Sequence, residues 1–394
     1  MANVSSSNGI EKFPELRFPN FSGPWKCVRI GDIYAERSER GAEGAELLSV
    51  TMTEGVKRRS DIEGKDNSSE DKGNYKVVCA GDMVYNSMRM WQGANGISPY
   101  NGIVSPAYTV LTPREKISNG FFAALFKTHV MISEFYRHSQ GMTSDTWNLK
   151  YPQIETIKTY IPPYDEQNKI SNFLELLNHK IDYQRRIVEL LKKYKRGVLQ
   201  NSFAPKEGKW YKQRFGDFFT EQNERTSETD RYPICSLTVE EGIILKPERY
   251  FREFLITKEG DSYKILRNGW FAYNPMNAHI GAIAPNRTGL DVCVSGYYNI
   301  FSVKNTSTTA FWEEFLKCYN MLCYYKVIAT GSLIEKQRVH YSQFVDIELP
   351  LPSIEEQTRT ASLIEVLNKK IRNAEFVLNH LQSLKTGIMQ KMFI

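Results

Sequence analysis

The sequence lacks the signatures of several common protein classes. It has no Cys-x-x-Cys pair, no Gly-x-x-x-x-Gly-Lys-Ser/Thr phosphate loop and no apolar run long enough to cross a bilayer. The 6 cysteines are scattered and the 6 histidines are dispersed, so we expect no metal site and free thiols in a reducing compartment. Residues 1–13 lack the apolar core of a signal peptide, so we expect a cytoplasmic protein without a membrane partner.

The composition is that of a folded and mildly basic protein. Of the 394 residues, 41% are hydrophobic, which allows real cores, and the length predicts two or three domains. The formal net charge is +6 and the sequence pI is about 8.8. This charge gives only weak support to nucleic-acid binding, because many soluble enzymes have a similar balance.

A long internal repeat is the most informative feature that is present. The segment from Glu166 to Phe203 recurs without a gap from Glu356 to Phe393, at an offset of 190 (356 − 166). The identical pairs include Gln167/Gln357, Leu177/Leu367, Lys195/Lys385 and Phe203/Phe393. A repeat of this length predicts two halves of similar architecture.

Both copies of the repeat have the pattern of a long helix with a coiled-coil seam. Apolar residues recur at alternating steps of three and four, which is typical of such a seam. The predicted seam residues are Leu174, Leu177, Ile181, Val188 and Leu191 in the first copy and Ile364, Leu367, Ile371, Leu378 and Leu381 in the second. Pro163 and Pro352 precede the two copies and acidic residues follow at once, as expected at helix N-termini.

We expect the two helices to pack on each other as an antiparallel pair, because either helix alone would expose its apolar stripe. The alternative is that each helix is an unrelated surface helix on its own domain. Lys195 and Lys385 occupy matched seam positions, and a polar residue on a seam often fixes the register. About 36 residues at a rise of 1.5 Å would form a rod roughly 54 Å long.

The parts of the chain outside the helices also repeat, with looser spacing. Tyr85-Asn86-x-Met88 recurs as Tyr273-Asn274-x-Met276. Short alternating runs predict strands, and one helix is expected in each half, over residues 121–137 and 311–325. The predicted fold class is α+β: a mixed α/β domain over residues 1–162, a long helix over 163–203, a similar domain over 204–352 and a second long helix over 353–394.

One motif is similar to a catalytic site. Tyr273-Asn274-Pro275-Met276 resembles the Asn-Pro-Pro-aromatic motif of amino-methyltransferases. The aligned copy, residues 85–88, lacks the proline, and no glycine-rich cofactor loop precedes either copy at a suitable distance. We therefore favour a framework role in a strand, and we predict no catalytic residue, no metal and no cofactor.

Taken together, the motifs resemble the specificity (S) subunits of type I restriction–modification systems. The resemblance rests on PELRFPNFSGPW followed by Gly31-Asp32-Ile33, on the Tyr-Asn-x-Met strand, on Ser105-Pro106-Ala107-Tyr108 and on two Pro-x-x-x-Glu-Gln helix entries, and it covers nearly the whole chain. It implies two target-recognition domains separated by the two long helices, related by a pseudo-twofold axis. It also implies a noncatalytic subunit that reads a bipartite, asymmetric sequence in double-stranded DNA.

The resemblance further implies protein partners. Two methyltransferase (modification) subunits would dock on the helices and supply S-adenosylmethionine binding and adenine methylation, and restriction/translocase subunits would join through the complex. Two different recognition domains held apart by a rigid helix pair would bind half-sites at a fixed separation. At 3.4 Å per base pair, a rod of roughly 54 Å spans at most about 16 base pairs, so the spacer should be shorter than that.

The halves differ most in the loops that follow their shared motifs, and these loops hold the candidate DNA contacts. Arg and Lys read guanine or phosphate, whereas Asn and Gln read adenine. The candidates are Lys57, Arg58, Arg59, Arg89 and Gln92 in the first half and Asn277, Arg287, Lys336 and Arg338 in the second. For each of them a solvated surface residue is the alternative. Arg89 and Asn277 are preferred because they hold the same aligned position just after the shared strand.

Two other functions stay open at this point. An autonomous DNA adenine methyltransferase would bind S-adenosylmethionine as an isolated chain, although the missing cofactor loop argues against it. A protein-binding scaffold without DNA specificity would bind no duplex even with methyltransferase subunits present.

Overall fold

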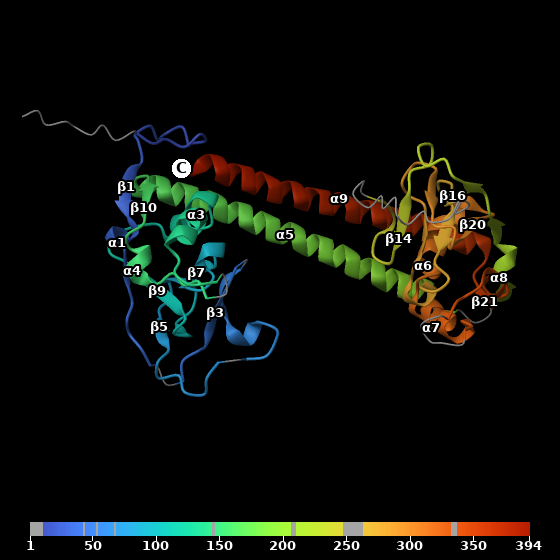
Figure 1. Ribbon diagram of the computed structural model, residues 1–394, viewed down its shortest axis with the longest axis horizontal. Helices are drawn as coiled ribbons and strands as arrows, with labels where there is room; N and C mark the ends of the chain where they lie inside the picture. The colour runs from blue at the N-terminus through green and yellow to red at the C-terminus, as the bar shows by residue number, and fades with distance from the viewer. Residues whose placement is uncertain are drawn as a thin grey trace, which may run out of the picture. The chain divides into compact units, whose positions relative to one another are not determined.

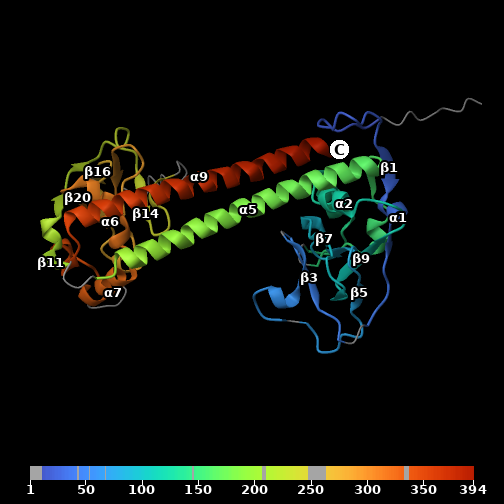
Figure 2. The same cartoon turned by 180° about the vertical axis from the view of Figure 1, so that it is seen from behind.

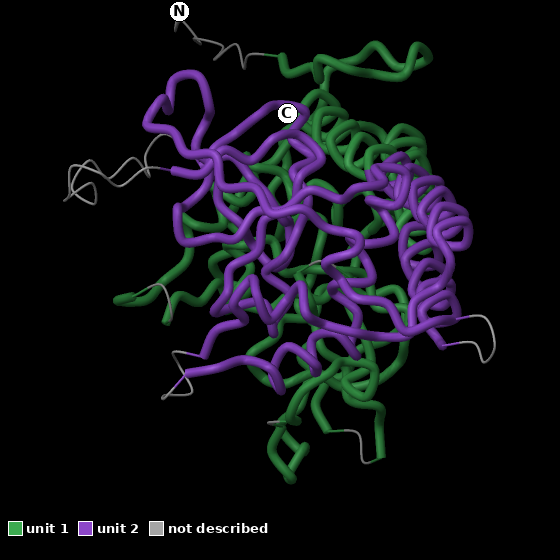
Figure 3. Tube along the Cα trace, turned by 90° about the vertical axis from the view of Figure 1, so that its right-hand side faces the viewer, with its two compact units in different colours: residues 1–186, 376–394 green, residues 187–375 purple. Residues whose placement is uncertain are grey.

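The computed structural model describes residues 11–41, 44–52, 54–66, 68–143, 146–205, 210–246, 263–331 and 337–394. The chain divides into two compact units, unit 1 with residues 1–186 and 376–394 and unit 2 with residues 187–375 (Figure 3). The boundaries fall inside the two long helices, α5 (Tyr164–Ser202) and α9 (Ile354–Met392). Each unit therefore contains one mixed α/β domain and part of each long helix.

The part of the first domain that the structure describes forms four short helices and ten strands. The helices are α1 (Ile30–Ile33), α2 (Asn119–Leu125), α3 (His129–His138) and α4 (Tyr151–Ile154), with 3₁₀ turns η1 (Arg59–Asp61) and η2 (Met90–Gln92). The strands are β1 (Lys26–Arg29), β2 (Tyr34–Glu36), β3 (Leu48–Thr51), β4 (Gly55–Arg58), β5 (Lys76–Val78), β6 (Met83–Asn86), β7 (Asn95–Ile97), β8 (Gly102–Val104), β9 (Tyr108–Pro113) and β10 (Lys158–Ile161).

The described residues of the second domain form three short helices and eleven strands. Its helices are α6 (Thr309–Phe315), α7 (Tyr319–Ile328) and α8 (Tyr341–Val345), with 3₁₀ turns η3 (Phe215–Asp217), η6 (Ala278–Ile280) and η7 (Thr306–Thr308). Its strands are β11 (Tyr211–Arg214), β12 (Phe219–Gln222), β13 (Arg225–Thr226), β14 (Cys235–Thr238), β15 (Gly242–Leu245), β16 (Tyr263–Leu266), β17 (Phe271–Tyr273), β18 (Ile283–Pro285), β19 (Val292–Val294), β20 (Asn299–Val303) and β21 (Glu348–Leu351).

The strand pairing is similar in both domains, except that the pair β5-β8 of the first corresponds to the three-stranded sheet β13-β16-β19 of the second. The four-stranded sheet of the first domain has the order β2-β9-β6-β7, and that of the second has the matching order β12-β20-β17-β18. The hairpin β3-β4 corresponds to β14-β15, and the pair β1-β10 to β11-β21. All named pairs are antiparallel. The prediction of two similar mixed α/β domains is confirmed.

Aromatic side chains join each domain to the end of one long helix. In unit 1, Phe393 lies just beyond α9 and packs with Phe121 of α2, at a ring distance of 5.3 Å. In unit 2, Phe203 lies just beyond α5 and packs with Phe311 of α6 at 5.6 Å. Phe203 and Phe393 are matched residues of the repeat, so the repeat encodes the anchor of each helix as well as its seam.

The two long helices pack antiparallel within each unit. In unit 1, Leu177 and Ile181 of α5 form a buried cluster with Leu381 of α9, and the start of α5 lies beside the end of α9 (Figures 1 and 2). In unit 2 the later part of α5 meets the earlier part of α9, where Lys192 pairs with Glu375 at 2.6 Å. The predicted seam residues are buried, except that Leu191 and Leu378 are partly buried. The predicted antiparallel helix pair is confirmed. The alternative, in which each helix is an unrelated surface helix on its own domain, is wrong.

One helix prediction in each half was wrong in its length. The segment predicted as a single helix over residues 121–137 forms α2 and α3, and the segment over 311–325 forms α6 and α7. In the first domain Thr128 caps the new helix, because its hydroxyl accepts from the Met131 N–H at 3.4 Å and donates to the Leu125 carbonyl at 2.7 Å. The apolar periodicity continues across the break, so it did not reveal the interruption.

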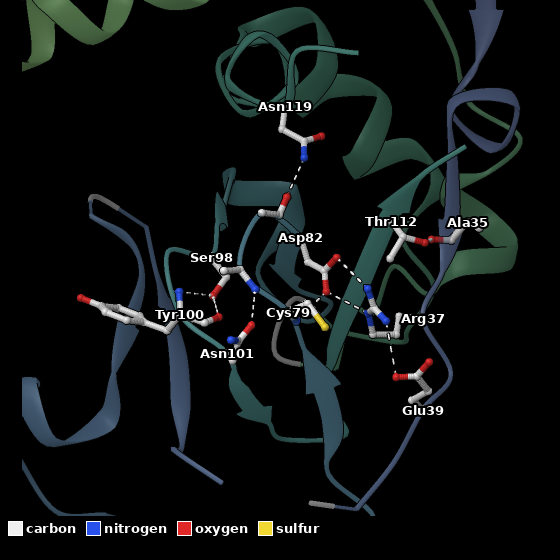
Figure 4. A network of polar contacts seen from close by, with 12 residues as sticks. Ala35, Arg37, Glu39, Cys79, Asp82, Ser98, Tyr100, Asn101, Thr112 and Asn119 are labelled. Atoms are coloured by element: carbon white, nitrogen blue, oxygen red, sulfur yellow. Dashed lines mark hydrogen bonds and ion pairs between the residues drawn. The ribbon is translucent and has the colours of Figure 1, made fainter. Parts of the chain in front are cut away.

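A partly buried ion pair fixes the start of strand β6 (Figure 4). The Arg37 guanidinium donates two hydrogen bonds to the Asp82 carboxylate, at 2.8 and 3.1 Å, and Asp82 also accepts from the Cys79 N–H at 2.8 Å. Asn119, the first residue of α2, donates to the Gly81 carbonyl at 2.6 Å. These contacts hold the start of β6 and the start of α2 together at one end of the sheet. The turn that differs between the two domains follows the opposite end of β6.

A second partly buried ion pair joins the N-terminal segment to the start of α5. Arg17 donates two hydrogen bonds to the Glu166 carboxylate, at 2.8 and 2.7 Å, and the Glu166 side chain is 1% exposed. The Leu16 N–H donates to the Lys391 carbonyl in α9 at 2.9 Å. The segment around Arg17 therefore bridges the two helices at this end of unit 1.

Replacing Arg17 by Met should destabilise unit 1 strongly, because it leaves the Glu166 carboxylate buried without its cation. The expected loss in the free energy of unfolding is about 3–5 kcal/mol, measured by urea denaturation. The control is the double variant Arg17→Met/Glu166→Gln, which removes the buried charge and should recover most of the loss. Equal stability of the single and double variants would contradict this account.

Candidate nucleic-acid interface

Each domain brings three turns together at one place. In the first domain these are the β3–β4 turn, the η2 turn and the linker between α2 and α3. A Cβ added at Gly96 of β7 would lie 2.7 Å from the Gly55 Cα, so the two backbones touch and only glycine fits. A Cβ added at Gly93, which ends η2 with a φ of +83°, would lie 3.5 Å from Ile132 of α3 and 3.7 Å from the Lys127 Cγ.

The second domain builds the same arrangement from its own residues. Gly281 ends η6 with a φ of +94°, and a Cβ added there would lie 3.8 Å from Val239 in the β14–β15 turn and 3.9 Å from Leu322 in α7. Gly93 and Gly281 are matched residues, and both take a left-handed conformation that favours glycine. The scaffold of the turn site is therefore duplicated.

The two preferred candidates lie at equivalent positions in this site. Arg89 precedes η2 with φ and ψ of −126° and 8°, and Asn277 precedes η6 with values of −113° and 10°. Asn277 is exposed and Arg89 is partly buried. Gln92 is the last residue of η2, so it shares the turn with Arg89. Each domain thus presents a different polar side chain from the same backbone position.

The other candidates of the first domain have protein partners. Lys57 pairs with Glu54, and the guanidinium carbon of Arg58 lies 4.7 Å from the centre of the Tyr100 ring. Arg59 donates to the carbonyl oxygens of Ile62, Gly64 and Lys65, at 2.7, 2.9 and 2.7 Å. With these bonds Arg59 holds its own loop in shape, which sequence reasoning had not foreseen.

The candidates of the second domain are divided between two places. Arg287 pairs with Glu313 of α6 at 2.8 Å. The Val339 N–H donates to the Pro275 carbonyl at 3.0 Å, so its neighbour Arg338 lies beside the turn that carries Asn277. The Arg338 guanidinium carbon is 5.2 Å from the centre of the Tyr297 ring. Lys336 lies outside the described residues.

An aromatic cluster next to η2 was missed by sequence reasoning. The Trp91 and Trp147 rings are 5.2 Å apart, the Tyr136 and Trp147 rings are 4.7 Å apart, and Tyr136 is 52% exposed. The matched positions in the second domain hold His279, Lys326 and Gln337. A partly exposed apolar surface beside an arginine can contact thymine methyl groups, whereas the polar set of the second domain can form hydrogen bonds.

The residues that resemble a methyltransferase motif form hydrogen bonds at the end of β17 and in the turn that follows it. The Tyr273 hydroxyl is buried and donates to the Val339 carbonyl at 3.2 Å, and burial raises its pKa well above the ordinary value. The Asn274 side-chain oxygen accepts from the Met276 N–H at 3.0 Å. Asn86 makes the same bond to Met88 at 3.0 Å in the first domain, so both asparagines shape the turn that follows the strand.

Partly exposed apolar side chains also line the long helices. Leu176, Tyr183 and Leu190 of α5 are spaced seven residues apart and are 68%, 68% and 65% exposed. This spacing places them on one face of the helix, away from the seam. On α9, Val366, Val377 and Leu384 are likewise exposed. Such a stripe of exposed apolar side chains is typical of a surface that binds a partner.

Neither metal-binding nor membrane-spanning features occur among the residues described. There is no group of three or more His, Cys, Asp or Glu side chains that could hold a metal ion. No described helix combines the length and the apolarity that crossing a membrane would require.

No protein-family model matches the sequence, and no curated protein is similar enough to be identified as a relative. The fold, by contrast, is that of type I restriction–modification S subunits. The S subunit from M. genitalium matches with a TM-score of 0.60 at 11% identity, over 97% of this chain and 99% of that one. A second match is a chain from a structure described as the structural basis of complex assembly and conformational transition of the type I R-M system. Its TM-score is 0.53 at 15% identity, over 94% of this chain and 97% of that one. The HsdS subunit from Thermoanaerobacter tengcongensis matches with a TM-score of 0.47 at 15% identity, over 94% of this chain and 96% of that one.

Proposed function

We propose that this chain is the noncatalytic DNA-recognition subunit of a type I restriction–modification complex. In this proposal each domain reads one half of a bipartite, asymmetric target in double-stranded DNA, and the helix pair sets the spacing between the halves. The subunit would work in the cytoplasm. The S-subunit fold over nearly the whole chain supports the proposal.

The observation that carries the proposal is one turn site built twice with different side chains. Arg89 and Asn277 occupy the same backbone position, as do Trp91 and His279. A protein that binds one symmetric target twice would keep these residues alike. Unlike side chains on a common scaffold favour two unlike half-sites, because specificity depends on the groups that meet the base edges.

We further propose that two methyltransferase subunits dock on the long helices and that restriction subunits join through the complex. The exposed stripe of Leu176, Tyr183 and Leu190 supports this, since these side chains stay apolar and outside the seam. The repeat supports two docked methyltransferase subunits, one for each long helix, because both helices carry exposed apolar residues of their own. Adenine methylation would come from the partner subunits.

Methylome sequencing of a host with and without this gene tests the proposed function. Deletion should remove every copy of one split adenine-methylated motif, and expression of the chain should restore it. If no such motif disappears, the proposal fails. Binding of S-adenosylmethionine by the isolated chain would instead favour an autonomous methyltransferase, and failure to bind any duplex alongside methyltransferase subunits would favour a protein scaffold.

A further inference from the structure

Among the described residues of unit 1, two partly buried lysines form no ion pair with a carboxylate. Lys127 lies in the linker between α2 and α3, and Lys385 lies on the seam of α9. Burial lowers the pKa of both side chains, and the charge of Lys385 lowers the pKa of Lys127 further. Asp182 and Arg185 of α5 also face Lys385: Asp182 raises the pKa of Lys385 and Arg185 lowers it, and the two pair with each other at 2.5 Å. Within the described residues, neither lysine forms an ion pair.

The second unit provides an internal comparison. Lys195, the repeat equivalent of Lys385, pairs with Glu314 of α6 at 2.5 Å. The residue that corresponds to Glu314 in the first unit is Ala124 of α2, at the same offset of 190 as the helix repeat (314 − 124). The scaffold is therefore the same, but the carboxylate that pairs with the lysine in unit 2 is replaced by an alanine methyl group in unit 1. A partly buried cation is costly without an anion, so a ligand that supplies one would be stabilised there.

Lys127 contacts the site formed by the β3–β4 turn, the η2 turn and the linker between α2 and α3. Its ammonium group donates to the Met52 carbonyl in the β3–β4 turn at 3.4 Å, and this contact is open to solvent. Its stem lies against Gly93 at the end of η2. The Lys127 side chain therefore runs from the end of the turn that carries Arg89 to the hairpin turn.

We propose that Lys127 and Lys385 together bind one phosphate group of the DNA backbone, at a site that unit 1 has and unit 2 lacks. This inference rests on the proposed function, and it adds a contact that carries no sequence information. A backbone phosphate at this position would bring one negative charge to the two lysines. It would also fix the register of the first domain on the duplex, because phosphate contacts position a protein while base contacts specify its target. It would also link helix α9 directly to the bound DNA.

The test uses the full chain assembled with its methyltransferase subunits, a duplex that carries the target motif and a duplex that lacks it. Affinity is measured over a series of salt concentrations for wild type, Lys385→Met, Lys127→Met and Ala124→Glu. Each variant should make the slope of log K against log salt shallower by about 0.9 and weaken binding about five- to tenfold at 0.1 M salt. The loss should be equal for both duplexes. Ala124→Glu should act like the lysine variants, because it supplies the carboxylate that unit 2 has.

The matched control lies in unit 2. The double variant Lys195→Met/Glu314→Met removes an ion pair that is already neutral, so its salt slope should equal that of wild type. Thermal unfolding checks the fold, and Lys385→Met should melt no lower than wild type because it removes an unpaired, partly buried charge.

Three results would overturn the inference. An unchanged salt slope in Lys385→Met and Lys127→Met means that the lysines meet no backbone phosphate. A loss confined to the target duplex means that they read bases. Inorganic phosphate that raises the melting temperature of wild type but not of Lys385→Met, with DNA binding unchanged, assigns the site to a free phosphate ligand. If wild type binds no duplex at all, the proposed function fails together with this site.

Discussion

Insertion of one heptad into each long helix is expected to lengthen the spacer of the DNA target by about three base pairs. The insertions belong between Arg186 and Ile187 in α5 and between Glu375 and Phe376 in α9, where the chain divides between its compact units. Seven residues add about 10.5 Å of helix, which corresponds to about three base pairs at 3.4 Å each. A heptad also preserves the seam, because its pattern repeats every seven residues.

Methylome sequencing of a host that carries the inserted variant measures this effect directly. The two half-sites should keep their base sequences while the number of unspecified bases between them rises. A heptad inserted into α5 alone is the control, and it should abolish methylation because the two seams no longer match. A variant with both insertions that methylates the original motif would exclude the helices as the element that sets the spacing.

Replacement of Leu367 by Asp is expected to abolish assembly with the methyltransferase subunits. Leu367 lies on the α9 seam and is 4% exposed, so its replacement buries a carboxylate that has no cation. Removing the partner of a buried charge costs about 3–5 kcal/mol, and an uncompensated charge on the seam should cost a similar amount. The helix pair should open, and the surface on which the methyltransferase subunits dock would be lost with it.

Copurification with tagged methyltransferase subunits measures assembly, and near-ultraviolet circular dichroism reports on the aromatic cores of the domains. Asn379→Asp is the matched control, because Asn379 is exposed on the same helix and the change adds the same charge. This control should assemble normally. Assembly of Leu367→Asp at wild-type affinity would contradict the role of the helix pair, and loss of the aromatic signal would mean that the domains depend on the seam.

The long helices could be predicted from the sequence because their information is local. Apolar residues at steps of three and four, prolines before the first turn and acidic residues within it are all visible over short distances. The predicted bounds of 163–203 and 353–394 lie close to the observed Tyr164–Ser202 and Ile354–Met392. The break at Thr128 was missed because a single hydrogen-bonding side chain, and no change in periodicity, ends one helix and starts the next.

The candidate site could be predicted only in part. Arg89 and Asn277 were chosen because the aligned repeat gives them one position, and the structure gives them one backbone conformation. Arg59 was chosen for its charge alone, and it bonds its own loop. Lys127 was missed although it matches Lys317 at the repeat offset, because its importance depends on a charge in α9 that is far away in the sequence.

The sequence by itself determined the duplication, the class of the fold and the register of the seam, because repeats and periodicity can be read from neighbouring residues. Only the tertiary structure decided which strands pair in the order β2-β9-β6-β7, which cations are bound to the protein's own carboxylates, and which are left without one. Those outcomes depend on contacts between residues distant in the chain, where burial and charge are set by folding.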